Sequence, residues 1–322
     1  MNNFWKRFIT TIVFLSLLTG SVCFPFTYSV WIFTFLCCLL TYGTAYELTK
    51  MLDGTEHKDL TAHLSAMACV FISASSILMK YYERLEIIQY TTNTAMEKFS
   101  IIMSHVVPWF IAFICWMAIL ASCNNKRRLT LLLNTVLSVF LVTMSIRCIV
   151  DIFFFGREEA VKCGGTHFNF IFLYFILITK LGDIGAYAIG TLSNKIKHGG
   201  NHKLIPSVSP GKSWEGAIGG LLTCMIGSVV LVAIFRGEHY VEIIQNRVLL
   251  YTCVAFLGVM FYFGGAVGDL AESSIKRTCK VKDSGHFLPG IGGLFDLTDS
   301  LMVNALIFLL VKEPLFQIFM VQ

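Results

Sequence analysis

The amino-acid sequence predicts an all-α integral membrane protein, a polytopic bundle of about nine transmembrane helices. The chain has 322 residues, of which 56% are hydrophobic and only 14% are charged. Soluble domains are typically about 25% charged. The charged residues are also unevenly distributed, because long apolar runs alternate with short polar segments. These observations exclude an ordinary soluble globular protein.

Each predicted helix corresponds to an apolar run near the length of about 20 residues that a bilayer core requires. The runs are Thr10–Phe26, Ser29–Leu48, Leu60–Tyr82, Ile101–Ser122, Leu129–Phe155, Phe168–Leu192, Gly216–Phe235, Val248–Val267 and Leu301–Phe319. Within the sixth run, the spacing of Gly182, Ala186 and Gly190 predicts a close approach of neighbouring helices, and Gly216, Gly219 and Gly220 do the same in the seventh.

The Lys and Arg residues of the connecting segments predict the orientation. With the N-terminus in the cytoplasm, the inside segments carry more of these residues than the outside segments, as the positive-inside rule requires. The inside residues are Lys6, Arg7, Lys50, Lys58, Lys126, Arg127, Arg128, Lys195, Lys197, Lys203, Lys212, Lys276, Arg277, Lys280 and Lys282. Contact with anionic lipid accounts for the net charge of +5, so no nucleic-acid partner is expected.

The chain divides by content into two regions. Residues 1–165 read as N-terminal transmembrane helices joined by segments without recognisable chemistry, and residues 166–322 as a C-terminal transmembrane region that carries nearly all the polar groups that need an explanation. In this second region the predicted orientation puts a polar site at the cytoplasmic side.

The strongest polar cluster lies between residues 269 and 299. Asp269, Glu272 and Lys276 fall on one face of a helix that continues from the eighth run, and Asp296 and Asp299 share a face of the helix that enters the ninth. The glycines between these helices permit a reversal that could bring Asp269 and Asp296 together. Two adjacent carboxylates repel unless a cation lies between them, which predicts a Mg²⁺ site.

Two earlier segments add polar groups. Asp183 lies inside the sixth run, where a charge is costly and by default marks a functional site; the alternative is a self-satisfied pair with Lys180. The segment from Ser193 to Glu215 is expected to be a loop whose Ser209, Lys212 and Ser213 offer donors to an anion next to a helix N-terminus. The alternative for this segment is an ordinary positively charged cytoplasmic loop.

Three ordered motifs resemble those of the phosphatidate cytidylyltransferases (CDP-diacylglycerol synthases). The first is S-x-I-K-R-x₄-K-D-x-G-x₂-L-P-G-x-G-G-L-x-D-x-x-D, from Ser273 to Asp299. The others are Asp183-x-x-Ala186-Tyr187-x-x-Gly190 and Ser209-Pro210-x-Lys212-x-Trp214-Glu215-Gly216. The resemblance implies a membrane enzyme that joins CTP and phosphatidate to give CDP-diacylglycerol and pyrophosphate.

The resemblance also implies roles for residues at the matching positions. Asp269 and Asp296 would bind Mg²⁺. The full catalytic set would be Asp269, Lys276, Arg277, Asp283 and Asp296, and the substrate-binding set Asp183, Tyr187, Ser209, Lys212, Ser213, Glu215, Lys282 and Asp299. The chain departs from the family at Ile291, where His is usual, and at Leu297, where Arg is usual.

Other readings stay open from the sequence alone. A non-enzymatic phospholipid binder or transporter would place polar residues through both halves of the membrane, whereas the strongest cluster here is confined to one side. A CTP-dependent lipid kinase would release CDP instead of pyrophosphate. The expected location is a bacterial inner membrane with the site facing the cytoplasm; the endoplasmic reticulum and a homodimer both remain open.

Overall fold

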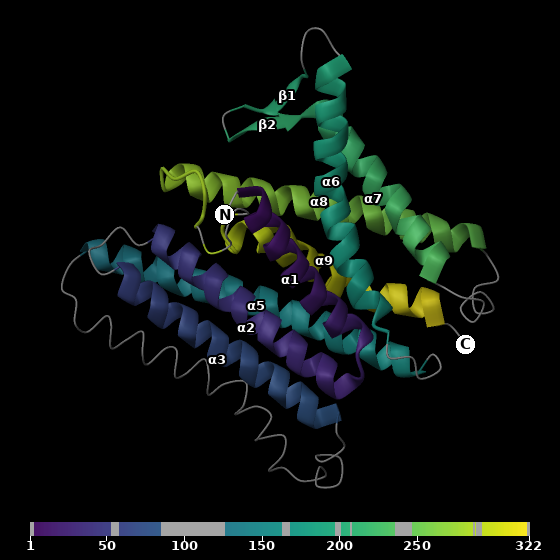
Figure 1. Cartoon of the computed structure of the whole chain (residues 1–322), viewed down its shortest axis with the longest axis horizontal. Coiled ribbons are helices and arrows are strands. Elements are labelled where there is room, and N and C mark those ends of the chain that lie inside the picture. Colours follow the sequence, from purple (N-terminus) through teal and green to yellow (C-terminus); the bar gives the residue numbers. More distant parts are fainter. Residues whose placement is uncertain are drawn as a thin grey trace. The chain divides into compact units, whose positions relative to one another are not determined.

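A computed structural model of the chain consists almost entirely of helices (Figure 1). It describes residues 3–52, 58–84, 126–162, 168–196, 201–206, 208–235, 247–285, 287 and 292–320. The elements are α1 (Asn3–Cys23), α2 (Phe26–Leu52), α3 (Lys58–Arg84), α5 (Lys126–Lys162), α6 (Phe170–Ile196), β1 (Lys203–Ile205), β2 (Ser209–Ser213), α7 (Trp214–Phe235), α8 (Arg247–Thr278) and α9 (Phe295–Met320).

Six helices of the described part are long and apolar enough to cross a membrane. They are Phe26–Leu52, Asp59–Tyr81, Asn134–Glu158, Phe170–Ile196, Trp214–Ile234 and Val248–Thr278. Each coincides with a run expected from the sequence, so these predictions are confirmed as helices. The expected run Ile101–Ser122 lies outside the described residues. The first and last runs form α1 and α9, which are helical but do not belong to these six.

The chain forms two compact units. The first contains residues 1–150 together with 281–296, and the second contains residues 151–280 together with 297–322. In the first unit α2 packs against both α1 and α3. Its core includes Phe33, Leu48 and Ile77, all nearly inaccessible to solvent. Residues 281–296 therefore belong to a different unit from the α8 helix that precedes them.

In the second unit α6 and α7 pack at very short range, as the small-residue spacing predicts. A Cβ atom on Gly220 would lie 2.8 Å from the carbonyl oxygen of Gly182, and one on Gly216 would lie 2.8 Å from that of Ala186. Side chains larger than hydrogen would push the two backbones apart. α8 packs on α7 as well, so these helices form a tight bundle.

The segment between α6 and α7 differs from the expected loop. β1 and β2 form a two-stranded antiparallel hairpin, in which Lys203 pairs with Ser213 and Ile205 with Ser209 (Figure 1). The Val208 amide donates to the Ile205 carbonyl at 3.4 Å and closes the turn. The Ser213 hydroxyl accepts from the Gly216 amide at 3.1 Å, which satisfies a donor that the first turn of α7 would otherwise leave open. The all-α prediction therefore holds except for this hairpin.

Candidate functional site

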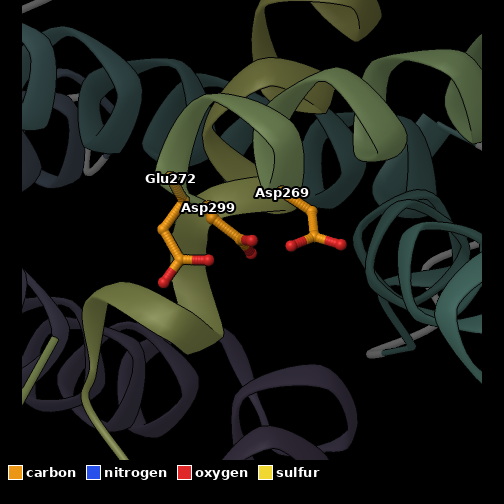
Figure 2. A group of neighbouring side chains, drawn as sticks. All are labelled: Asp269, Glu272 and Asp299. Atoms are coloured by element: carbon orange, nitrogen blue, oxygen red, sulfur yellow. The ribbon is translucent and has the colours of Figure 1, made fainter. Parts of the chain in front are cut away.

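Three carboxylates of the second unit meet at one place. Asp269 and Glu272 lie one turn apart on α8, and Asp299 reaches them from α9 (Figure 2). One oxygen of each carboxylate lies within 4.8 Å of the others. Glu272 and Asp299 are buried, whereas the Asp269 side chain is 36% exposed. We call these residues the carboxylate cluster.

Gly268 allows α8 and α9 to approach closely enough to form the cluster. A Cβ atom at Gly268 would lie 2.6 Å from the carbonyl oxygen of Asp299. Asn304, one turn further along α9, is fully buried and donates to the Phe261 carbonyl of α8 at 3.0 Å and to the Thr179 hydroxyl of α6 at 3.1 Å. The three helices are thus tied together just beyond the carboxylates.

Two lysines neutralise part of the cluster. Lys212 of β2 forms an ion pair with Asp269, with 2.8 Å between Nζ and Oδ2. Lys276 forms an ion pair with Glu272 at 2.7 Å, one turn along α8. The hairpin is held to α8 a second time, because Nε of Arg277 lies 3.5 Å from the Val208 carbonyl that accepts from it.

A third lysine reaches the start of α9. Lys180 Nζ donates to the Leu297 carbonyl and to the Ser300 hydroxyl, both at 2.9 Å. Its distance to the Asp183 carboxylate is longer, 3.8 Å. The pair with Asp183 that the sequence allowed is therefore present, but Lys180 is not satisfied by that pair alone. It connects α6 to the helix that carries Asp299.

The carboxylate cluster suits a hard divalent cation. Burial, followed by the charges of Asp269 and Asp183, raises the pKa of Asp299 to about 6, although Lys180 and the Ser300 amide act in the opposite direction. The donors of the group are carboxylate oxygens only, the ligand type that Mg²⁺ prefers. A cation would remove the mutual repulsion that this arrangement creates.

The hairpin and the first turn of α7 position several predicted substrate-binding residues. The Ser213 side chain is buried and accepts from the α7 backbone. Glu215 holds His202, accepting from its amide at 3.2 Å and lying 2.9 Å from its Nδ1 atom. Ser209 opens β2, and on α6 the Tyr187 side chain is exposed. The oxygen atoms of Ser213 and Glu215 thus accept hydrogen bonds that shape the hairpin and its junction with α7.

The remaining predicted residues belong to the first unit. Lys282 and Asp283 are exposed, and Asp296 accepts a hydrogen bond from the Gly293 amide at 3.1 Å. The predicted role of Asp296 as a metal ligand stays a prediction. Ile291 lies outside the described residues.

The sequence placed Glu272 in the polar cluster but gave it no role in the site, and it left Lys180 out of the site. The i, i+3 spacing of Glu272 from Asp269 placed both on one helix face, and this signal could have identified it. Lys180 carried the signal of a charge inside an apolar run. The sequence predicted that α9 would bring Asp296 to Asp269, and it gave Asp299, which lies in the cluster, a substrate-binding role.

Comparison with known proteins agrees with the motifs. The model of the cytidylyltransferase family matches residues 5–314. A phosphatidate cytidylyltransferase of Staphylococcus haemolyticus is 39% identical over 143 residues, which cover 44% of this chain and 48% of that protein. One of Haemophilus influenzae is 40% identical over 135 residues, 42% of this chain and 43% of that protein.

A phosphatidate cytidylyltransferase of Mycobacterium bovis is 39% identical over 123 residues, 38% of this chain and 35% of that protein. The chain thus spans about half or less of the length of these relatives. The family model, in contrast, extends over nearly all of the chain, including both units. The chain belongs to the cytidylyltransferase family.

Proposed function

We propose that the protein transfers the cytidylyl group of CTP to phosphatidate, releasing pyrophosphate and forming CDP-diacylglycerol. The observation that carries the proposal is the carboxylate cluster with its lysines, which lies next to helices apolar enough to cross a membrane. The similarity to three phosphatidate cytidylyltransferases supports the choice of substrates.

The reaction needs charge neutralisation more than it needs a base. A phosphate oxygen of phosphatidate is already anionic; it forms a bond to the α-phosphorus of CTP while the bond from that phosphorus to the pyrophosphate oxygen breaks. Cationic side chains reduce the repulsion between the two anions and align them. We assign Lys212 and Arg277 to the phosphates. Lys276 instead balances the buried charge of Glu272.

We further propose that Asp269, Glu272 and Asp299 hold Mg²⁺. A bound divalent ion would supply positive charge to the triphosphate and to the leaving pyrophosphate. In the structure Lys212 forms an ion pair with Asp269. A cation held by that carboxylate would leave the Lys212 ammonium free to bind a substrate phosphate.

We place the site at the cytoplasmic face of a bacterial inner membrane. The distribution of Lys and Arg supports this orientation, and the relatives named above are bacterial proteins. The acyl chains of phosphatidate would stay in the bilayer while its phosphate reaches the cluster.

Two labels on CTP test the proposal and separate the alternatives. Purified protein in detergent is incubated with phosphatidate, Mg²⁺ and CTP labelled at either the α- or the γ-phosphorus. Cytidylyl transfer predicts α-label in lipid and γ-label in pyrophosphate. A lipid kinase would put γ-label into lipid, and a binder or transporter would leave CTP intact; either result would refute the proposal.

A further inference from the structure

A buried carboxylate in α2 contacts two described stretches of the chain, residues 281–285 and 292–296, which together we call the signature segment. Glu47 is only 3% exposed. Its Oε2 atom accepts from the Ser284 hydroxyl at 2.9 Å and from the Phe295 amide at 2.9 Å. All three residues belong to the first unit. One side chain thus holds two points of the chain that are eleven positions apart.

The surrounding backbone leaves a space for this carboxylate. Cβ atoms at Gly285 or Gly293 would collide with the Glu47 carboxylate oxygens, so glycine at both positions makes room for them. Gly43 lies one turn before Glu47 on α2. The fully buried side chain of Leu294 occupies the volume that a side chain at Gly43 would take. The α2 face formed by Gly43 and Glu47 is therefore fitted to the signature segment.

The contacted positions adjoin residues for which the family resemblance implies catalytic roles. Ser284 follows Asp283, and Phe295 precedes Asp296. The Phe295 amide is also one of the donors that the first turn of α9 leaves open, and a carboxylate is favoured at that end of a helix. Glu47 therefore holds the residue that follows Asp283 and the residue that precedes Asp296 at the start of α9.

Packing alone does not account for a glutamate at this position. Among the described residues, the Oε1 atom of Glu47 is buried without a hydrogen-bond partner. A buried carboxylate with an open acceptor is costly, and an apolar side chain of similar volume often stabilises a protein as well or better. What the carboxylate provides is a pair of directed hydrogen bonds to the segment.

We propose that Glu47 is a positioning residue for the transfer reaction: it holds the signature segment in the conformation that catalysis requires. This inference rests on the proposed function. It assigns a task to the N-terminal helices, which carry no recognisable chemistry in the sequence.

The test compares Glu47→Ala, Glu47→Gln and Ser284→Ala with Thr41→Val. Thr41 is a matched control because it is buried on the same helix, and in the described part of the chain its hydroxyl donates to the Cys37 carbonyl within α2 at 2.6 Å. For each variant, kcat per folded molecule and the KM for CTP are measured, together with hydrogen exchange of peptides covering 281–296. The Gln variant keeps one oxygen that can accept both bonds.

Loss of positioning predicts that Glu47→Ala lowers kcat by about 100-fold and removes exchange protection selectively from the signature segment. Glu47→Gln should restore most of both, Ser284→Ala should lose less, and Thr41→Val should behave as wild type. A lower thermal stability of Glu47→Ala with unchanged kcat per folded molecule and unchanged protection of the segment would overturn the inference. If wild-type protein makes no lipid product, the proposed function fails, whereas the exchange measurement still tests the role of Glu47.

Discussion

Two Lys–carboxylate pairs of the protein differ in how far they are removed from water. Lys276 and Glu272 are 2.7 Å apart, and their side chains are only 13% and 4% exposed. Lys50 and Asp59 are 2.6 Å apart, with side chains 40% and 59% exposed. The first pair balances a charge that solvent cannot reach, whereas the second is screened by water.

Removing the lysine should therefore have unequal effects. Lys276→Met leaves Glu272 buried and without this counter-charge, and we expect it to destabilise the protein by about 3–5 kcal/mol. Lys50→Met should cost no more than about 1 kcal/mol. Thermal unfolding of both variants in the same detergent measures the difference. Equal losses would show that Glu272 is not buried as described.

At the scale of elements, the helices were predictable and the hairpin was not. Apolar runs long enough to cross a bilayer specify helices with little ambiguity, because every backbone polar group in lipid must be satisfied within the segment. The strands β1 and β2 are short, and β2 contains Pro210 and Gly211, so no alternating pattern marked them. Their pairing depends on contacts such as that between His202 and Glu215.

The candidate site was predictable in part for the same reason. Spacing along one helix placed Asp269 and Glu272 on a common face. The meeting of Asp299 with them depends on where α8 crosses α9, which Gly268 permits and which no spacing reveals. Glu47 carried the general signal of a charge inside an apolar run, but its position in the sequence does not reveal its partners Ser284 and Phe295.

The contact between α6 and α7 gives a second prediction. In Gly220→Ala the new methyl group would lie 2.7 Å from the Tyr262 ring and 2.8 Å from the Gly182 carbonyl. We expect a loss of about 1–3 kcal/mol in stability, the usual cost of overpacking. Gly211→Ala in β2 is the matched control, since its Cβ would meet nothing within 4 Å. The thermal unfolding midpoints of the two variants are compared with that of wild type. A Gly220 variant as stable as the control would contradict the close packing of α6 and α7.

At the scale of the whole molecule, the orientation in the membrane follows from charge. The hairpin and the segment after α8 are separated by two of the six apolar helices, so they lie on the same side if both helices cross the membrane. The positive-inside rule predicts that this side faces the cytoplasm.

Epitope tags test that orientation. A tag between β1 and β2 should be accessible in inverted membrane vesicles and protected in right-side-out vesicles. A tag in residues 236–246, which connect α7 to α8, should show the opposite pattern. The same accessibility for both tags would mean that α7 does not cross the membrane.

Transfer of α-labelled cytidylyl from CTP to phosphatidate tests whether the carboxylate cluster carries the reaction. The transfer is measured for wild type, Asp299→Asn and Asp59→Asn, each with Mg²⁺ and with EDTA. We predict labelled lipid for wild type and for Asp59→Asn, whose carboxylate lies in the exposed pair with Lys50. Asp299→Asn should lower the rate by at least about 100-fold, and EDTA should abolish it. Undiminished transfer by folded Asp299→Asn would contradict the assignment of the chemistry to the carboxylate cluster.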